Sequence, residues 1–400
     1  MPHSSTRATG PLSGVRVVEQ GTFITGPFAS MMLADMGAEV IKVERPDGGD
    51  PFRQHDGTDY ASTFQSVNRN KRSIAIDLRD ENDRETLHDL VRSADVYLHN
   101  FRPDAAVRMG IHSEALLELN PRLIYCGISG LGSTGPYAKR PAYDTVAQSL
   151  SGMLSMTLDP VDPRISGPAN ADAVTSLYAA QGILAALYQR ERDGLGHVVE
   201  LSMLESMVHF LAEPFAGYFA KEIAPGPYTR AATSQSFALR CADDHVLAIH
   251  LSSPVKFWES LLAVTGLERL ADDPRFLRFT DRRANHEPLR QELQKVFSAE
   301  TRDVWFARLL ENDVPSAPVL DLAGVAADPQ FRHLEIELTA EHPVKGTVRS
   351  LRSPFTFDGV VMSEFTPPPT IGEHSDEIRI LLRSDKRLNE VLSATEKPTQ

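Results

Sequence analysis

Residues 14–45 read GVRVVEQGTFITGPFASMMLADMGAEVIKVER, with a β-rich segment at each end and a helical segment between them. We expect residues 14–19 to form a strand. Pro27 is expected to open a helix over residues 28–36, because the missing N–H of proline costs nothing in a first turn. Residues 38–44 then return as a second strand. A strand–helix–strand unit of this kind predicts parallel strands.

The same alternation continues along the chain. Further strands are expected at residues 73–77, 95–98, 123–129 and 197–202, and helices at residues 81–93, 171–190 and 203–219. Strands that alternate with helices indicate a parallel sheet covered on both faces. The sequence therefore predicts an α/β protein with a Rossmann-like parallel sheet in its large domain.

The composition changes after residue 223. Residues 224–236 (APGPYTRAATSQS) are rich in Pro, Gly, Ser and Thr, which is typical of a linker. A smaller α-rich domain is expected at residues 237–319, with helices at residues 254–265, 281–297 and 301–312. A second linker at residues 320–333 then leads to a C-terminal part, residues 334–390, with a β-rich segment at residues 335–357. We expect this part to return to the large domain that residues 11–223 begin.

Charge and cysteine content limit the possible functions. The 400 residues include 54 acidic and 41 basic side chains, a net charge of -13, which argues against nucleic-acid binding. The two cysteines, Cys126 and Cys241, form neither a disulfide framework nor a spaced metal motif. No apolar run resembles a signal peptide or a membrane span. We therefore expect a cytoplasmic protein that does not bind membranes.

Basic residues gather near the ends of the expected strands: Arg45, Lys71, Arg72, Arg79, Arg102, Arg108, Lys139 and Arg140. Ligands of α/β sheets bind at the carboxyl ends of the strands. These side chains could cradle phosphate groups in an otherwise acidic protein. Scattered solvated charge is an equally good interpretation of the composition alone.

Gly130, Gly132 and Gly135 lie in GLGSTG, which formally matches the dinucleotide fingerprint GxGxxG. That fingerprint requires a helix to begin at the glycines, and Pro136 follows them at once. A flexible loop is therefore the better interpretation. His374 in GEHSDE lacks spaced partner ligands, so we expect a surface loop there and no metal site.

Two aspartates lie near expected helix starts. Asp172 opens the Ala-rich helix in SGPANAD, and its position alone favours an N-terminal cap or an acid stabilised by the helix dipole. Asp144 in PAYD has the character of a turn acid. Position alone assigns neither residue to catalysis.

The motifs taken together resemble those of class III CoA-transferases, the family of formyl-CoA transferase and carnitine CoA-transferase. After residues 14–45, the matching segments are NRNKRSIAIDLR (68–79), ADVYLHNFRP (94–103), NPRLIYCGISGLGSTGPY (120–137), PAYDTVAQSLSG (141–152), SGPANAD (166–172) and GEHSDEI (372–378). They span nearly the whole chain in the family's order.

The resemblance implies site residues. Asp172 matches the nucleophilic aspartate, which replaces the capping interpretation, and Asp144 matches a functional acid of formyl-CoA transferase. The matching CoA contacts are Ile24, Thr25, Arg45, Ile76, Asp77, Leu78, Arg79, Asn100, Phe101, Arg102, Arg108 and Arg140, with Tyr143 beside them. The glycine-rich active-site loop of formyl-CoA transferase is not visible, and residues 229–236 take its place. That departure weakens the case for oxalate or formyl-CoA as substrates.

The implied reaction is acyl-CoA:carboxylate CoA transfer through an aspartyl anhydride and an aspartyl-CoA thioester on Asp172. Backbone N–H groups of the loop at Gly130, Gly132 and Gly135 could stabilise the oxyanions. Coenzyme A enters as part of a substrate, and no permanently bound cofactor or metal is implied. The resemblance also implies an interlocked homodimer.

Two alternatives belong to other functional classes. An α-methylacyl-CoA racemase would use a His–Asp acid/base pair, with the histidine directly before Asp144. Tyr143 occupies that position, which favours a transferase. A non-catalytic CoA-binding protein would lack the nucleophile, and Asp172 is present. No motif names the two acids exchanged.

Overall fold

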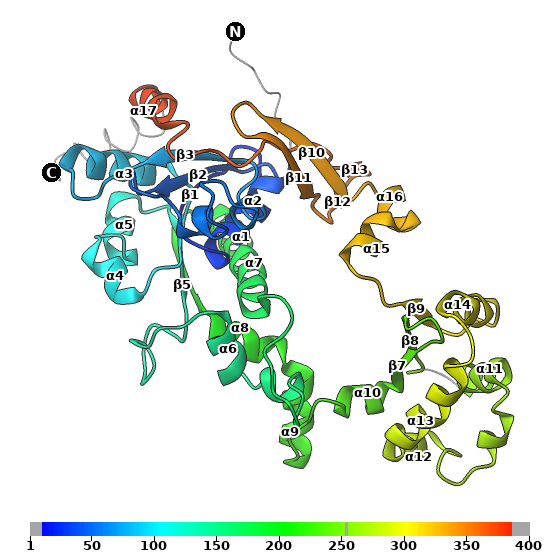
Figure 1. Ribbon diagram of the computed structural model, residues 1–400. Coiled ribbons are helices and arrows are strands. Elements are labelled where there is room, and N and C mark those ends of the chain that lie inside the picture. The colour runs from blue at the N-terminus through cyan, green and yellow to red at the C-terminus, as the bar shows by residue number, and fades with distance from the viewer. Residues whose placement is uncertain (1–9, 253–254, 386–400) are drawn as a thin grey trace. The chain divides into compact units, whose positions relative to one another are not determined.

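The computed structural model describes residues 10–252 and 255–385, shown as a coloured ribbon in Figure 1. Two compact units are formed. The first contains the described residues up to Met153, residues Gly167–Ala212 and the described residues from Glu335. The second contains Leu154–Ser166 and Glu213–Leu334. Each unit has its own hydrophobic core.

A six-stranded parallel sheet forms the centre of the first unit. Its strands are β1 (Arg16–Gln20), β2 (Glu39–Glu44), β3 (Lys71–Ala75), β4 (Val96–His99), β5 (Ile124–Ser129) and β6 (His197–Ser202). The order across the sheet is β3-β2-β1-β4-β5-β6, and every neighbouring pair is parallel. The order reverses between β1 and β4, where α/β sheets of this topology bind ligands. The expected Rossmann-like α/β fold is confirmed.

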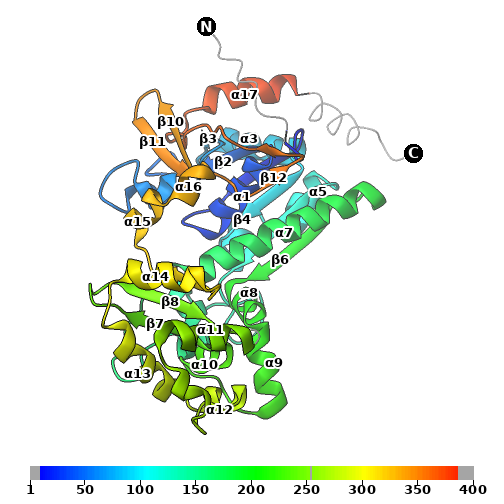
Figure 2. The ribbon, with the colours of Figure 1, turned by 90° about the vertical axis from the view of Figure 1, so that its right-hand side faces the viewer.

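Helices cover both faces of this sheet (Figure 2). On one face lie α1 (Thr25–Asp35) and α7 (Asn170–Asp193); on the other lie α3 (Glu81–Ser93), α5 (Ser113–Leu119) and α17 (Ser375–Ser384). Adjacent strand residues point to opposite faces. Val17 accordingly packs in the core beneath α1 and α7, and Val18 in the core beneath α3 and α17. Both valines are fully buried, as expected for strands covered on two sides.

Shorter elements complete the first unit. They are a 3-10 turn at Pro51–Gln54, α2 (Ser62–Gln65), α4 (Pro103–Arg108), α6 (Asp144–Leu150), α8 (Met203–Phe210), the hairpin of β10 (Glu337–His342) and β11 (Gly346–Leu351), and the pair β12 (Thr356–Phe357) and β13 (Val360–Val361). The β-rich segment expected at residues 335–357 is therefore a hairpin followed by β12, separate from the main sheet.

Two helices expected to be continuous are broken. Instead of one helix at residues 203–219 there are α8 and α9 (Ala212–Lys221), and instead of one at 281–297 there are α12 (Phe279–Ala284) and α13 (His286–Phe297). The second helix of each pair carries a proline in its first turn, Pro214 or Pro288. A proline cannot donate to the carbonyl four residues earlier, so a new helix begins there.

The second unit combines helices with a small sheet that was not expected. The antiparallel strands β7 (Ser236–Arg240), β8 (Val246–His250) and β9 (Ser316–Pro318) pack with α11 (Val255–Thr265), α13 and α14 (Arg302–Glu311). The remaining elements are α10 (Thr229–Ser234), α15 (Leu322–Ala327), α16 (Pro329–His333) and 3-10 turns at Leu154–Met156 and Glu268–Ala271. Residues 224–236, expected as a linker, thus contain a helix. The expected helix start at residue 254 lies outside the described residues.

Candidate active site

A cavity of about 590 Å³ opens where the strand order reverses. Residues that follow β1, β2, β3 and β4 line it, which places it at the carboxyl edge of the sheet. Six of the expected CoA contacts share this lining: Arg45, Ile76, Asp77, Leu78, Arg79 and Phe101. The tertiary structure therefore brings three separated sequence segments to one concave surface.

Two guanidinium groups, those of Arg45 and Arg79, line the cavity together with the carboxylate residues Glu44, Asp47, Asp50 and Asp77. Arg45 is exposed, and its Nη2 reaches the carbonyl of Gly49 at 3.4 Å. The Arg79 side chain is 89% exposed and pairs with Asp77 at 2.8 Å. The hydrogen bonds from Arg79 lower the pKa of Asp77 to about 2. Both arginines are free to turn toward a phosphate group, because their other contacts are few and solvated.

The other arginines matched to CoA contacts lie outside this cavity's lining. Arg108 pairs with Asp104 at 2.7 Å, and the Arg140 guanidinium stacks over the Tyr137 ring at 4.4 Å. Arg102 is exposed at the start of α4. These three side chains are solvent-accessible, but the first unit alone does not gather them around one ligand site.

Asn100 holds the loop between β1 and α1. Its Nδ2 donates to the Thr22 carbonyl and to the Thr25 hydroxyl, both at 2.7 Å, and its Oδ1 accepts from the Thr22 N–H at 2.9 Å. Ile24 is the N-terminal flanking residue of α1. The amide that was expected to contact CoA is thus occupied within the protein, and it fixes the shape of the loop at the cavity edge.

A buried charge network lies beneath the same loop. Lys71 is 2% exposed, and its Nζ donates to Glu19 at 3.2 Å and to the Pro27 carbonyl at 2.7 Å. Burial lowers the pKa of Lys71 to about 7, against the opposing effect of Glu19. Lys42 pairs with Glu19 at 3.1 Å and with Asp50 at 3.0 Å. Lys71 is therefore unavailable to a ligand.

This network corrects the expectation of a phosphate cradle at Lys71 and Arg72. Arg72 bonds Glu39 at 2.9 Å, on the strand next to its own. The network also positions the loop, because Glu19 accepts the Gly21 N–H at 2.6 Å and Asp50 accepts the Phe23 N–H at 3.1 Å. Glu19, Lys42 and Asp50 were not among the residues predicted from the sequence. The available signal was the presence of charged residues in otherwise apolar strands, where burial requires paired partners.

Asp172 occupies the third position of α7, but it does not cap that helix. Ala169 flanks the helix start and offers no side-chain cap. The cap comes from α6: Asp144 Oδ1 accepts the Ala171 N–H at 2.8 Å and lies 3.4 Å from the Asp172 N–H. Among the described residues, no hydrogen bond or ion pair reaches the Asp172 carboxyl group.

The ionisation of Asp172 is accordingly perturbed. Burial, and second the negative charge of Asp144, raise the pKa of Asp172 from 3.8 to about 7. The helix N–H groups, which were expected to favour the ionised form, are thus opposed by burial and by the charge of Asp144. Those N–H groups are shared with Asp144, and the burial penalty exceeds the dipole's favourable effect.

The β1–α1 loop contacts the elements that carry both aspartates. Phe23, which has φ 60°, packs edge-on against Tyr143 with ring centroids 5.9 Å apart, and Tyr143 directly precedes α6. Ser176, one turn after Asp172, donates to the Thr25 carbonyl at 2.9 Å. The loop at the edge of the cavity thus also touches the start of α6 and the first turns of α7.

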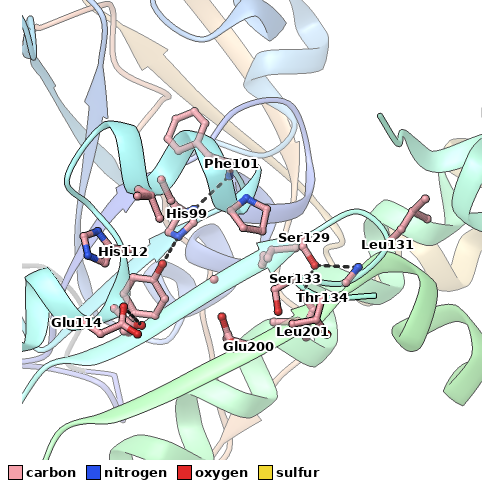
Figure 3. A pocket seen from close by; sticks show the side chains of 18 of the residues that line it. His99, Phe101, His112, Glu114, Ser129, Leu131, Ser133, Thr134, Glu200 and Leu201 are labelled. Atoms are coloured by element: carbon pink, nitrogen blue, oxygen red, sulfur yellow. Dashed lines mark hydrogen bonds between the residues drawn. The ribbon is translucent and has the colours of Figure 1, made fainter. Parts of the chain in front are cut away.

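A second cavity, of about 570 Å³, lies along β4, β5 and β6 (Figure 3). Gly132 and its loop neighbours line it, together with His99 and Tyr125, whereas Gly130, Gly135 and Asp172 are not among its lining residues. The Gly132 N–H donates to the Ser129 hydroxyl at 3.2 Å. A role of this loop in oxyanion binding stays a prediction, because that N–H already has an acceptor.

His99 in this cavity is a neutral, structural histidine. The Phe101 N–H donates to its Nδ1 at 3.1 Å, so its Nε2 carries the proton that faces Tyr125 Oη at 2.6 Å (Figure 3). Burial lowers the pKa of His99 to about 4. His374, expected in a surface loop, is also built into the fold, because its Nδ1 accepts the Ser73 N–H at 3.2 Å.

Residues 10–252 and 255–385 form neither a cluster of metal ligands nor a membrane-spanning helix. No group of three or more His, Cys, Asp or Glu side chains in these ranges is placed to hold a metal ion. Within the same ranges, no helix has both the length and the apolar character needed to span a bilayer. The chemistry of the described site rests on carboxyl, guanidinium and backbone groups.

The fold and the site define a doubly wound α/β protein with a cavity at its switch point, lined in part by two arginines, and a perturbed carboxyl group on a nearby helix. A family model described as CoA-transferase family III matches residues 12–375. The chain belongs to this class III CoA-transferase family and is an enzyme of it.

Similar proteins with assigned activities are also CoA-transferases. The chain is 36% identical to an acetyl-CoA:oxalate CoA-transferase of Acetobacter aceti, over 80% of this chain and 84% of the relative. It is 32% identical to the human succinyl-CoA:glutarate CoA-transferase, over 98% of this chain and 91% of the relative. A solved CAIB/BAIF family protein from Brucella suis matches with a TM-score of 0.82 and 33% identity, over 94% of this chain and all of that one.

Proposed function

We propose that this enzyme moves coenzyme A from an acyl-CoA to a free carboxylic acid, with Asp172 as the covalent carrier. The observation that carries the proposal is the unpartnered, partly buried carboxyl group of Asp172 at the start of α7. A carboxylate without hydrogen-bond donors keeps its electron pairs available for attack. Its position also matches the nucleophile of the class III family.

The transfer takes four steps, each of which exchanges one acyl bond. The Asp172 carboxylate attacks the thioester carbonyl and expels CoA thiolate, which leaves a mixed anhydride. The thiolate attacks the aspartyl carbonyl and releases the donor acid, which leaves an aspartyl-CoA thioester. The acceptor carboxylate then attacks this thioester, expels the thiolate and forms a second anhydride. The thiolate finally attacks the acceptor's acyl carbon and regenerates Asp172.

The cavity at the ends of β1–β4 suits the nucleotide part of the substrate. Arg45 and Arg79 supply mobile positive charge for phosphates, and Ile76, Leu78 and Phe101 supply apolar surface for the adenine ring. We assign the CoA nucleotide to this cavity. The loop at its boundary leads into α1, whose first residue, Thr25, accepts a hydrogen bond from Ser176 on the helix that carries Asp172.

Short dicarboxylic acids are the proposed acids. The relatives named above exchange CoA between acetyl-CoA and oxalate or between succinyl-CoA and glutarate. A third relative, from Haloarcula hispanica, is a succinyl-CoA:mesaconate CoA-transferase at 34% identity. A mass-spectrometric screen of dicarboxylic and monocarboxylic acceptors with succinyl-CoA and acetyl-CoA checks this; activity with monocarboxylates alone would contradict it.

We also propose that the chain works as a homodimer in the cytoplasm. No residue of α9 is buried, although this helix carries Phe215, Tyr218 and Phe219. An apolar helix without a covered face requires a partner surface. The free cysteines, Cys126 and Cys241, suit a reducing compartment. Light scattering should give a dimer mass, and a monomer at micromolar concentration would contradict the assembly.

The decisive experiment is covalent loading. Mixed with an acyl-CoA and no acceptor, the wild-type protein should gain the mass of CoA as a thioester. Hydroxylamine should convert this adduct to a hydroxamate on the peptide that contains Asp172. Asp172→Ala and Asp172→Asn should show no adduct and no turnover while they still bind CoA. Asp172→Glu should lose on the order of 100-fold, because the carboxylate is displaced by a methylene. An adduct on another residue would refute the mechanism.

A further inference from the structure

Gln148 is a buried polar residue whose side chain bonds a member of the site. It lies on α6, one turn after Asp144, and is 4% exposed. Its Nε2 donates to Asp144 Oδ2 at 2.7 Å. A buried amide that donates to a carboxylate fixes that carboxylate in one orientation. Gln148 has no part in the reaction steps described above. Its burial beside the site therefore needs a different explanation.

The orientation that Gln148 fixes has a specific consequence. With Oδ2 held by Gln148, the other oxygen of Asp144 faces the first amides of α7 and accepts the Ala171 N–H at 2.8 Å. The first amides of a helix lack partners within the helix and need an acceptor. Here the acceptor belongs to a different helix, since Ala169 and the residues that follow it provide no side-chain cap.

Asp172 is acylated and then regenerated in each turnover. A cap that comes from another helix is therefore better suited to α7 than a cap made by Asp172. The anhydride and the thioester of Asp172 are uncharged, so a cap made by Asp172 itself would be weakened in both intermediates. Losing a carboxylate cap destabilises a helix and frays its first turn. With Asp144 as the cap, the same turn stays fixed while Asp172 alternates between charged and acylated forms.

We propose that Gln148 is a positioning residue: it holds Asp144 as the permanent cap of α7, so that the helix start that carries Asp172 stays in place throughout turnover. This inference rests on the proposed function, because it assigns the alternation of charge to Asp172. Gln148 acts only through Asp144 and touches neither substrate nor the reacting atoms.

The charged groups on the surrounding elements have partners of their own. On α8, Glu205 bonds the Ser202 hydroxyl and His209 bonds Tyr178. On α1, Asp35 pairs with Arg69. On β6, His197 pairs with Asp193 and Glu200 lines the second cavity. Asp144 is the charged neighbour that acts on Asp172.

Three variants distinguish the effect of the hydrogen bond by which Asp144 caps α7 from the effect of its negative charge. Gln148→Met keeps the volume and removes the donor, so the rate of covalent loading should fall about tenfold with little change in the KM for acyl-CoA. Asp144→Ala removes the cap and should lose at least as much. Asp144→Asn keeps an oxygen that accepts the Ala171 N–H. If the Gln148 amide rotates by half a turn, its oxygen can accept a hydrogen bond from the new Asn amide, so the bond between positions 144 and 148 is also kept. This variant should therefore load within a few-fold of the wild type.

A double-mutant cycle tests whether Gln148 acts through Asp144. In the Asp144→Ala background, Gln148→Met should have no further effect on loading. Ser149→Ala is the matched control, because this exposed neighbour bonds only the Thr145 carbonyl of its own helix. Additive losses, an unaffected Gln148→Met protein, or an Asp144→Asn protein as impaired as Asp144→Ala would each overturn the proposal.

A second readout does not depend on catalysis. The infrared stretch of the protonated Asp172 carboxyl group, identified by its loss in Asp172→Asn, reports the titration of this residue directly. Gln148→Met should move that titration to lower pH, since the carboxylate of Asp144 is then no longer held in place beside Asp172. If the wild type forms no CoA adduct but this shift is observed, the covalent mechanism fails and the positioning role stands. If loading occurs but the shift is absent, the positioning role fails.

Discussion

The hydroxyl of Ser176 donates to the backbone carbonyl of Thr25 at 2.9 Å, and both residues are buried. This bond joins α7 to the first residue of α1, directly after the loop between β1 and α1. Asp172 lies one turn before Ser176, and the loop borders the cavity assigned to CoA. This side-chain hydrogen bond adds to the apolar packing of α1 against α7 and helps to set the position of the proposed nucleophile relative to the nucleotide site.

Removing that bond should impair loading more than stability. For Ser176→Ala we expect a loss of about 1 kcal/mol in unfolding free energy and a fall of about tenfold in the rate of covalent loading. Stopped-flow release of CoA thiol measures the rate. Thr175→Val is the control, because the Thr175 hydroxyl bonds only Ala171 within α7. Equal rates of covalent loading for Ser176→Ala and the wild type would show that the hydrogen bond from Ser176 to Thr25 does not position Asp172.

Covalent loading should depend on pH through Asp172. The nucleophile is the ionised carboxylate, and its pKa is raised to about 7 by burial and by Asp144. Below that value the ionised fraction falls about tenfold per pH unit, so loading at about pH 5 should be roughly 100-fold slower than at about pH 8. Single-turnover measurements over this interval check it. A flat profile would mean that Asp172 stays ionised or is not the nucleophile.

The same carboxyl group should lower the stability of the wild type at alkaline pH. Its pKa is raised from 3.8 in the unfolded chain to about 7 in the fold, so between these values the folded protein binds the extra proton. Stability therefore falls as pH rises through this window and is lowest above it. Asp172→Asn should be more stable than the wild type at about pH 8, by on the order of 2 kcal/mol, and nearly equal at about pH 4.

Chemical denaturation at the two pH values measures this difference. Glu191→Gln serves as the control, because Glu191 is an exposed carboxylate on the same helix and should give no pH-dependent gain. A gain for Asp172→Asn that is equal at both pH values would show that packing, and not charge, determines its effect.

Arg45 should contribute to CoA affinity without affecting chemistry. Arg45→Gln removes one exposed positive charge from the cavity, and we expect about a fivefold to tenfold rise in the dissociation constant for CoA, with a smaller effect at high salt. Calorimetric titration measures it. Arg84→Gln on α3 is the control, since Arg84 is exposed but does not line the cavity. Similar losses in both variants would point to a general charge effect.

The enzyme should not exchange protons next to the thioester. A racemase needs an acid/base pair at the substrate α-carbon, and the residue before Asp144 is Tyr143, whose ring packs against Phe23. Incubation with a 2-methylacyl-CoA in deuterated water should leave the α-carbon unlabelled by mass spectrometry. Rapid deuterium incorporation would favour the racemase alternative and refute the inference from Tyr143.

The periodic features of the sequence were sufficient to predict the central fold. Apolar segments such as residues 38–44 and 123–129 became β2 and β5, because strands buried on both faces need continuous apolar character. The breaks at Pro214 and Pro288 were missed, although both prolines are visible in the sequence. A first-turn proline permits either a new helix or the early part of an existing one, and only the neighbouring packing decides between them.

Charged residues were harder to interpret than apolar ones. Lys71 and Arg79 flank the strand expected at residues 73–77, yet Lys71 is buried against Glu19 while Arg79 is exposed to solvent at the cavity. A charged side chain is buried only where an opposite charge meets it, and that partner comes from another strand. The sequence spacing of Glu19 and Lys71 gives no sign of their contact.

The sequence by itself determined the alternating α/β fold, the family and the position of Asp172 at a helix start. Only the tertiary structure decided how that aspartate ionises. A helix start offers free amides to any nearby acceptor, and the chain brings Asp144 from α6 to take the Ala171 amide at 2.8 Å. Asp172 is left partly buried beside a like charge, with its pKa raised to about 7. Hydrogen bonds within one helix follow from local sequence, whereas desolvation and Coulomb repulsion depend on which distant residues the fold places nearby.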